Sequence, residues 1–333
     1  ISVRLPLASS TYEPQVAHPF FANLLPEGPA RIAICERLGI SVGNDVSLLE
    51  ALGNDTAGAF QFRTEADRES VPRRDVNVDE LLRWAEGEPT IPAGAFPRLS
   101  LAGAQHNHTV VIEYETFFMP ASDEASTHIL KFNADRFKHL ALNEYFSNRF
   151  ASALGLDVVN CWIQTIEDVS YLVVERYDRV SSATGVGRLH QEDFCQILGA
   201  MPSRKYETEG GPSLADVVGA TRRYSSAPAA DLVQLSRWVV FNAISGNADA
   251  HAKNIALLYT DKGLRLAPFY DLVCTRAYPG LSPDLAMSIG GESDPDRLTK
   301  DRWKTFAEQT RIKGITEIAG ELVERAPDAL EEV

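Results

Sequence analysis

The chain has 333 residues, of which 44% are hydrophobic and 9% aromatic, a composition and length that suit a folded protein with two lobes. Its formal net charge of −14 at pH 7 excludes a protein that wraps nucleic acid directly, because phosphate binding needs clustered Lys and Arg. No apolar run approaches the roughly 18 residues that a membrane span requires, so we expect no membrane association.

Cysteine usage predicts the compartment. The four cysteines stand far apart and form no Cys-x-x-Cys pair, so they predict neither a zinc site nor a disulfide framework. The chain begins at Ile1 without a signal-like segment, which we take as an interior start. We therefore expect a protein of the reducing cytoplasm.

The first predicted region is a small accessory subdomain over residues 1–70. Pro-rich turns alternate there with a helical pattern, and an apolar run after Gly58 predicts a short strand. Residues 63–97 are charged and Pro-rich apart from a helical segment near VDELLRWAEG. This composition is typical of a linker.

Strands dominate the next stretch. LSLAGAQHNHTVVIEYE predicts a strand, a tight loop and a second strand, and STHILKFN predicts another. HLALNEYFSNRFASALGLDV carries apolar residues at helical spacing, with Gly155 as the expected C-cap, and YLVVERYD is typical of a buried strand. The order strand, strand, helix, strand predicts an ATP-binding N-lobe over residues 71–177.

The remainder, residues 178–333, predicts a helical C-lobe. LHQEDFCQILGA, SLADVVGATRRY and DLVQLSRWVVFNAIS are each amphipathic, and NIALLYTDKGLRLAPFYDLV predicts a β-hairpin turning at Thr-Asp-Lys-Gly. Further helices close the chain. We therefore predict an α+β, bilobal fold of the protein-kinase type, with a mixed α/β N-lobe and a mainly helical C-lobe.

The string GNADAHAKNIALL carries the most chemical information. Asp249 stands five residues before Asn254, and Asp271 follows the predicted hairpin. Protein kinases place an Asp on the substrate hydroxyl, an Asn five residues later on Mg²⁺, and a second Asp on Mg²⁺ after a hairpin. The spacing therefore predicts Asp249 as the catalytic carboxylate and Asn254 with Asp271 as metal ligands, although Asp and Asn also serve as plain turn residues.

A kinase also needs a cation and a backbone loop on the ATP phosphates. Lys131 lies within an otherwise apolar strand, which favours a phosphate partner, although an edge-strand lysine that prevents aggregation is the alternative. Glu144, on the following helix, is the expected ion-pair partner of Lys131 or else a solvated carboxylate. The loop of residues 100–105 contains one glycine, a weak phosphate-binding pattern by itself.

Nine motifs together resemble one family. RLSLAGAQ, THILK, NEYF, VERYDR, RLHQEDFCQ, GNADAHAKN and FYDLV occur in this order, after PFFANLLPEG and GNDTAGAF. They span about Pro19 to Asp271 and are similar to the HipA family of bacterial toxin kinases, which act in type II toxin–antitoxin systems and are linked to persistence.

The resemblance implies roles for particular residues. The loop backbone of Ala102, Gly103, Ala104 and Gln105 would cover the ATP phosphates together with Lys131. Ser100 would be an autophosphorylation site that inactivates the kinase. The hinge holding the adenine would be Glu175, Arg176 and Tyr177, and His251 would support the catalytic loop. Asn107 departs from the pattern, because relatives commonly carry Lys there.

The resemblance also implies partners. These are a HipB-like helix-turn-helix antitoxin, operator DNA reached only through that antitoxin, and an aminoacyl-tRNA synthetase whose phosphorylation would halt translation. ATP and Mg²⁺ are the expected cofactors. Two alternatives stay open: a catalytically silent corepressor that only grips an antitoxin, and a small-molecule phosphotransferase with the same Asp-x₄-Asn arrangement.

Overall fold

The computed structural model describes residues 2–7, 11–62, 71–87, 107–133, 137–182 and 185–333. The chain forms two compact units, each built from separate stretches of sequence. The helical unit comprises Ile1–Phe20, Asn143–Val159 and Glu192–Val333, and the sheet unit comprises Phe21–Leu142 and Asn160–Gln191. The predicted division into residues 1–70, 71–177 and 178–333 stays a prediction about domains.

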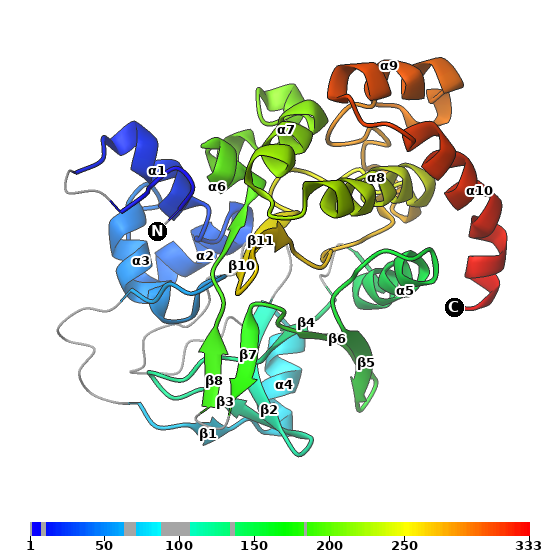
Figure 1. The fold of residues 1–333 in the computed structure, drawn as a ribbon. Helices are drawn as coiled ribbons and strands as arrows, with labels where there is room; N and C mark the ends of the chain where they lie inside the picture. Colours follow the sequence, from blue (N-terminus) through cyan, green and yellow to red (C-terminus); the bar gives the residue numbers. More distant parts are fainter. Residues whose placement is uncertain (1, 8–10, 63–70, 88–106, 134–136, 183–184) are drawn as a thin grey trace. The chain divides into compact units, whose positions relative to one another are not determined.

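The sheet unit contains a six-stranded sheet in the order β1-β3-β2-β4-β6-β5 (Figure 1). All five strand pairs are antiparallel. The tight β2–β3 turn places Tyr114 and Glu115 at positive φ. The strands are β1 (Arg74–Asp75), β2 (Asn107–Glu113), β3 (Thr116–Met119), β4 (His128–Lys131), β5 (Cys161–Ile166) and β6 (Val169–Glu175). The strands predicted from STHILKFN and YLVVERYD and the second strand predicted from LSLAGAQHNHTVVIEYE are thus confirmed, whereas the first strand and the loop of that stretch lie outside the described residues.

The apolar core of this sheet includes a helix from the region predicted as a linker. Val110, Leu130 and Val173 are fully buried in the core. Helix α4 (Val78–Ala85) adds Leu81 and Trp84 to the same cluster. The helical segment predicted near VDELLRWAEG is therefore confirmed, whereas the linker interpretation was wrong for residues 74–85, because the apolar side chains of this helix fill the core.

The rest of the sheet unit consists of short elements. They are α2 (Gly28–Leu38), α3 (Asp45–Leu52), the 3₁₀ turn η1 (Gly53–Asp55) and the hairpin of β7 (Arg179–Ser182) with β8 (Gly185–Arg188). The strand predicted after Gly58 does not form among the described residues 57–62. Instead Phe62 donates its N–H to Gly53 O at 2.8 Å, and its ring covers the glycine so closely that a Cβ at Gly53 would lie 2.5 Å from Phe62 Cβ.

Two helices have one end in each unit: α1 (Pro14–Ala22) and α5 (Leu140–Ala153). Helix α5 is the one predicted from HLALNEYFSNRFASALGLDV. Gly155, just after it, has a φ of 84°, the left-handed conformation that favours glycine at a helix end. The predicted C-cap region is therefore confirmed.

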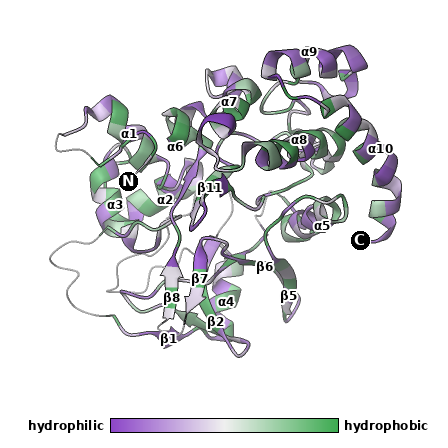
Figure 2. Cartoon of the chain, viewed as in Figure 1, coloured by the Kyte–Doolittle hydropathy of each residue, from purple (hydrophilic) through white to green (hydrophobic). Residues whose placement is uncertain are grey.

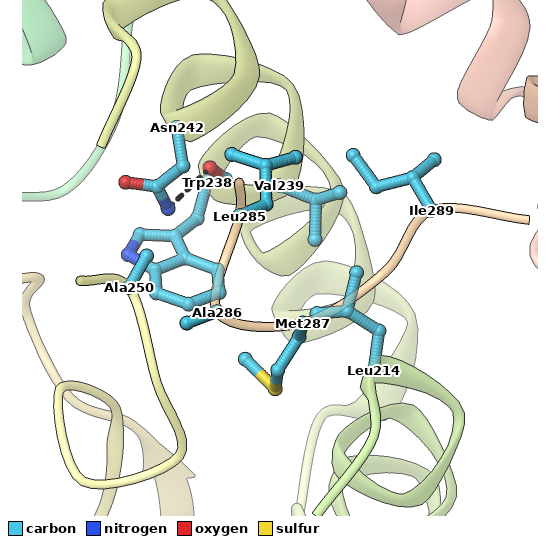
Figure 3. A pocket seen from close by; sticks show the side chains of 9 residues that line it. All are labelled: Leu214, Trp238, Val239, Asn242, Ala250, Leu285, Ala286, Met287 and Ile289. Carbon is cyan, nitrogen blue, oxygen red and sulfur yellow. Dashed lines mark hydrogen bonds between the residues drawn. The ribbon is translucent and has the colours of Figure 1, made fainter. Parts of the chain in front are cut away.

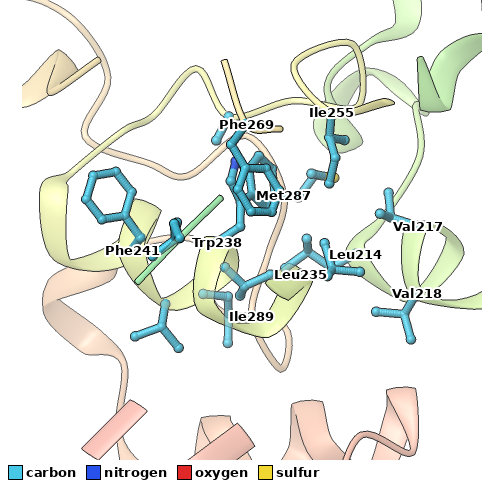
Figure 4. Close-up of a cluster of buried hydrophobic side chains, with 14 of the residues drawn as sticks. Leu214, Val217, Val218, Leu235, Trp238, Phe241, Ile255, Phe269, Met287 and Ile289 are labelled. Carbon is cyan, nitrogen blue, oxygen red and sulfur yellow. The ribbon is translucent and has the colours of Figure 1, made fainter. Parts of the chain in front are cut away.

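Helix α8 (Pro228–Ser245) forms the centre of the helical unit, with α7 (Leu214–Tyr224) and α10 (Ile315–Glu331) packed against it. Leu235, Trp238 and Phe241 are at most 2% exposed and lie in the cluster shown in Figure 4. The outer helix α9 (Lys300–Thr310) is far more hydrophilic than α8 (Figure 2). Burial of α8 fixes the position of the loop that follows it. Within the described ranges, no helix is both long and apolar enough to cross a membrane.

The other elements of this unit are short. A three-stranded sheet has the order β11-β10-β9, and its β10–β11 hairpin confirms the one predicted at Thr-Asp-Lys-Gly. The helix predicted from LHQEDFCQILGA is shorter than expected, because Asp193 and Gln196 form a capping box that starts α6 only at Phe194. The elements are β9 (Gln191–Asp193), α6 (Phe194–Leu198), η3 (Pro202–Arg204), η4 (Glu207–Glu209), β10 (Ala256–Thr260), β11 (Gly263–Leu266), η5 (Thr275–Ala277) and η6 (Pro295–Arg297).

Candidate active site

The loop that follows α8 is held by its own polar side chains. Gly246 ends the helix at a φ of 67°, and its carbonyl accepts a hydrogen bond from Thr275 Oγ1 at 2.9 Å. The Thr275 Oγ1 in turn accepts from Ala248 N at 2.8 Å. Asn247, which is 1% exposed, donates through Nδ2 to Asn242 Oδ1 and accepts from Asp249 N at 3.1 Å. Because these bonds join the loop to α8 and η5, the loop is rigidly placed before any ligand binds.

Asp249 combines a fixed backbone with an accessible side chain. Its carbonyl accepts from His251 N and from Asn254 Nδ2, each at 2.8 Å. Its side chain is 49% exposed, whereas that of His251 is only 5% exposed, with Nε2 lying 3.7 Å from Asp249 Oδ1. A carboxylate that is held in this way and is open to solvent can accept a hydrogen bond from the hydroxyl group of a bound substrate.

Asn254 is oriented by the same loop. Its Nδ2 is committed to the Asp249 carbonyl, so its Oδ1 is the side-chain atom left to act as a metal ligand. The residue is 8% exposed. The predicted spacing of Asp249 and Asn254 therefore corresponds to a direct contact inside one loop.

Asp271 follows the β10–β11 hairpin in an uncommon backbone conformation. Its φ of 58° lies in the left-handed region, which Asp and Asn tolerate better than most residues and which often occurs at functional sites. The hydroxyl of the preceding Tyr270 donates to Lys253 O at 2.7 Å. This bond brings the residue before Asp271 against the residue before Asn254, so the two predicted metal-ligand segments lie side by side.

The start of α5 is tied to the segment after Asp271. Asn143 Nδ2 donates to Cys274 O at 3.0 Å, and Asn143 Oδ1 accepts from Cys274 N at 2.8 Å. Glu144, the next residue, is only 3% exposed. The alternative of a solvated helix carboxylate is therefore wrong for Glu144.

Lys131 belongs to the sheet unit. It ends β4, an internal strand of the six, and lies opposite Asn107 on β2 and Leu172 on β6. The edge-strand interpretation is therefore wrong. Lys131 is 8% exposed, and a buried ammonium needs an oxygen partner. Asn107 shares its face of the sheet, because directly paired residues point to the same side.

The predicted hinge residues leave β6 beside a buried ion cluster. Arg176 donates to Asp178 and to Ser126 Oγ at 3.0 Å, and lies 3.4 Å from Asp55 Oδ2. Arg179 binds the same two carboxylates. The Arg176 side chain is only 2% exposed, so it is committed to the cluster. The hydroxyl of Tyr177 donates to Gln191.

The predicted phosphate loop lies outside the described residues. This holds for Ser100, Ala102, Gly103, Ala104 and Gln105. Among the described residues, no group of three or more His, Cys, Asp or Glu side chains gathers as a metal site. Asn254 and Asp271 nevertheless fit Mg²⁺, which is commonly held by one or two protein oxygens together with nucleotide phosphates and water.

A small apolar hollow adjoins the loop at Ala250 (Figure 3). Trp238 and Asn242 of α8 line it together with residues 285–287. The Asn242 Nδ2 donates to Trp238 O, as the dashed line in Figure 3 shows. The hollow is therefore bounded by the same helix that leads into the loop of Asp249.

Several side chains that build the site did not stand out in the sequence. Asn143, Tyr206, Thr275 and Tyr270 act through contacts distant in sequence, at separations of 131, 43, 27 and 17 residues. Asn247 was visible within GNADAHAKN, but only the fold shows that its amide joins the loop to α8. The motif GNADAHAKN was therefore the sequence feature that could indicate Asn247.

Comparisons with known proteins identify the family of the chain. Residues 99–330 match the family described as the HipA-like C-terminal domain, and residues 1–63 match the HipA N-terminal domain. Y4mE of Sinorhizobium fredii is 40% identical over 94% of this chain and 77% of its own length. The serine/threonine-protein kinase toxin HipA of Shewanella oneidensis is 33% identical over 100% of this chain and 80% of its own length.

A solved structure agrees as well. The Shewanella oneidensis complex of HipA, HipB and operator DNA contains a chain that matches with a TM-score of 0.88 and 31% identity, covering 99% of this chain and 81% of that one. Together these findings define a serine/threonine protein kinase that uses ATP. The chain belongs to the HipA family of toxin kinases.

Proposed function

We propose that this kinase transfers the γ-phosphoryl group of ATP to a serine or threonine of a protein, using a bilobal protein-kinase-like arrangement with Asp249 at its centre. Two hydrogen bonds support this most strongly. Asn254 contacts Asp249 directly, and the Tyr270–Lys253 bond brings the Asp271 segment to the same loop. Kinases need these three oxygen-bearing groups together.

In this proposal each residue has one task. Asp249 accepts a hydrogen bond from the attacking hydroxyl and takes its proton as the new P–O bond forms and the bond to the ADP oxygen breaks. Asn254 Oδ1 and the Asp271 carboxylate would hold Mg²⁺, which neutralises phosphate charge when bound. His251 supports the loop.

The remaining predicted residues would bind the nucleotide. Lys131 and the backbone of residues 102–105 would contact the phosphates, with Glu144 as the proposed ion-pair partner of Lys131. Any adenine contact from residues 175–177 would come from main-chain atoms or from Glu175 and Tyr177, because the Arg176 side chain is buried in its ion cluster. Asn107 would replace the positive charge that relatives carry opposite Lys131 with an uncharged amide.

The partners are proposed from the relatives. The Shewanella structure contains HipA with HipB and operator DNA, which supports a HipB-like antitoxin here. A net charge of −14 favours DNA contact through that antitoxin alone. The proposed target is an aminoacyl-tRNA synthetase in the cytoplasm, as the family resemblance implies.

Incubation with labelled ATP, alone and with a cell lysate, tests the function. We expect label on the chain itself at Ser100 and on a lysate protein. Ser100→Ala should lose self-labelling and stay active longer toward the target, because phosphoserine adds about −1.5 to −2 charges beside the ATP phosphates. No transfer would support a silent corepressor, and label only on small molecules would support the second alternative. Self-labelling that is undiminished in Ser100→Ala would contradict the Ser100 assignment.

Asp271→Asn should lower the affinity for Mg·ATP by about tenfold or more, because an anionic ligand of a hard cation is lost. Asn suits the test, since it tolerates the φ of 58° observed at this position. Calorimetry with Mg·ATP and with metal-free ATP measures the effect, which should be confined to the metal complex. Asp261→Asn, in the exposed hairpin turn, is the control. Equal Mg·ATP affinity in both variants would count against the metal assignment.

A further inference from the structure

A tyrosine outside the catalytic-loop motif contacts the proposed catalytic carboxylate. The hydroxyl of Tyr206 donates to Asp249 Oδ1 at 2.5 Å. Its ring meets the His251 ring edge to face, with centroids 5.1 Å apart and planes at 82°. One oxygen of Asp249 is thus flanked by two side chains, while the side chain as a whole stays 49% exposed.

The segment that carries this tyrosine has its own supports. We call residues 202–211 the tyrosine segment. The Tyr206 carbonyl accepts hydrogen bonds from Glu209 N at 3.1 Å and Gly211 N at 2.9 Å. A Cβ at Gly211 would lie 2.2 Å from Arg204 O, so only glycine permits this close turn. The turn therefore fixes Tyr206 from its C-terminal side.

The residue after the tyrosine anchors the segment a second time. Glu207 accepts from Ser288 N at 2.5 Å and from Ser288 Oγ at 3.1 Å, and its own N–H donates to Ala286 O at 3.2 Å. Ala286 lines the hollow beside Ala250, the neighbour of Asp249 (Figure 3). The position of the Tyr206 hydroxyl is thus set by contacts that do not involve Asp249.

We propose that Tyr206 is a positioning residue that sets the rotation of the Asp249 carboxylate. By occupying Oδ1, its hydroxyl directs Oδ2 toward the acceptor hydroxyl that is to be phosphorylated. Carboxyl torsions of this kind are broad and nearly two-fold when unconstrained, so a fixed donor narrows the orientations from which a proton can be accepted. This role rests on the proposed function of Asp249.

The hydroxyl and the ring of Tyr206 have separable roles. A purely structural role would depend on the ring, which packs against His251 and is retained in phenylalanine. The positioning role depends on the hydroxyl alone. Tyr206→Phe therefore isolates the proposed effect, and it leaves behind an Asp249 side chain that water can still reach.

The helical unit offers a matched control in Tyr259. Its hydroxyl donates to Glu192 Oε1 at the same distance of 2.5 Å, on β10 and β9. Tyr259→Phe thus deletes an equivalent tyrosine–carboxylate bond away from the catalytic loop. We expect it to lower the unfolding midpoint and leave the turnover number unchanged.

The test measures phosphate transfer from labelled Mg·ATP to casein and to the chain itself. Tyr206→Phe should lower kcat about tenfold or more, as expected for loss of a hydrogen bond to a charged group, with the KM for Mg·ATP unchanged. An unchanged or increased kcat, or a loss that Tyr259→Phe reproduces, would overturn the positioning role.

A double-mutant cycle with Asp249→Asn separates this proposal from the function on which it rests. In the Asp249→Asn background, Tyr206→Phe should have almost no further effect, because the two residues act as one unit. If Asp249→Asn is inactive and Tyr206→Phe is fully active, the positioning role alone fails. If Asp249→Asn keeps the wild-type rate, the catalytic assignment fails and the positioning role fails with it.

Discussion

Asp249→Asn should lower the rate of phosphoryl transfer by roughly 10²- to 10⁴-fold, the range that general-base catalysis typically contributes. The substitution suits the site because asparagine keeps an oxygen that can accept from Tyr206, and the backbone bonds of residue 249 do not involve its side chain. Loop geometry should therefore survive while the proton-accepting charge is lost.

The affinity for Mg·ATP should stay close to that of the wild type, because Asp249 is assigned to the acceptor hydroxyl. Single-turnover transfer from labelled ATP measures the rate, and calorimetry measures the affinity. Asp261→Asn again serves as the control. A wild-type transfer rate in Asp249→Asn would refute the catalytic assignment. A large loss of nucleotide affinity would instead indicate that Asp249 is a metal ligand.

Asp55→Asn should lower the free energy of unfolding by about 3–5 kcal/mol, the cost of breaking a buried ion pair by removing one partner. Asp55 lies 2.9 Å from Arg179 and 3.4 Å from Arg176, with side chains that are 2–3% exposed. Arg188 is 3.7 Å away. Without Asp55, Arg176 and Arg179 would share Asp178 as their remaining carboxylate, and Arg188 would lose its ion pair with Asp55.

Denaturant-induced unfolding of the wild type and of Asp55→Asn measures the loss in free energy of unfolding. Glu113→Gln is the control. Glu113 forms an ion pair with Arg73 while its side chain is 52% exposed, and such surface pairs contribute at most about 1 kcal/mol to stability. Equal stabilities of the two variants would show that the cluster does not stabilise the fold as proposed.

The same cluster predicts a dependence on pH. Burial by itself would raise the pKa of Asp55, but Arg176 and Arg179 outweigh that effect, and the pKa lies below its ordinary value. The pKa of Asp178 is lowered in the same way against its burial. Because the folded pKa values are depressed, this stabilisation is present above about pH 4 and is lost as pH falls through the folded pKa values. In Asp55→Asn, the free energy of unfolding should therefore fall less steeply as the pH is lowered below about 4.

Periodicity and spacing predicted the helix and the hairpin around the candidate site. The apolar pattern before Asp249 predicted helix α8, and the Thr-Asp-Lys-Gly turn predicted the hairpin before Asp271; both form. These features are local, so a single sequence displays them. The contacts that bring the motif residues together, such as the bond from the Tyr270 hydroxyl to Lys253 O, depend on the tertiary fold.

The incorrect predictions have the same origin. Residues 74–85 have a linker-like composition, yet Leu81 and Trp84 complete a core that they share with residues from distant strands. Lys131 was compatible with an edge strand until the order β2-β4-β6 placed it inside the sheet. The hinge prediction for Arg176 stays a prediction, but the sequence did not show that its side chain pairs with Asp55, which is 121 positions earlier in the chain. Strand order and ion clusters are set by tertiary structure, which spacing alone does not encode.

We propose that Asn254 and Asp271 hold the metal of a phosphoryl-transfer site built around Asp249. A crystal grown with Mn²⁺ in place of Mg²⁺ and a non-hydrolysable ATP analogue tests it most directly, because the anomalous signal of Mn²⁺ locates the ion. We predict an anomalous peak within coordination distance of Asn254 Oδ1 and the Asp271 carboxylate, with the γ-phosphate facing Asp249. A bound nucleotide whose metal peak lies away from both side chains would contradict the account.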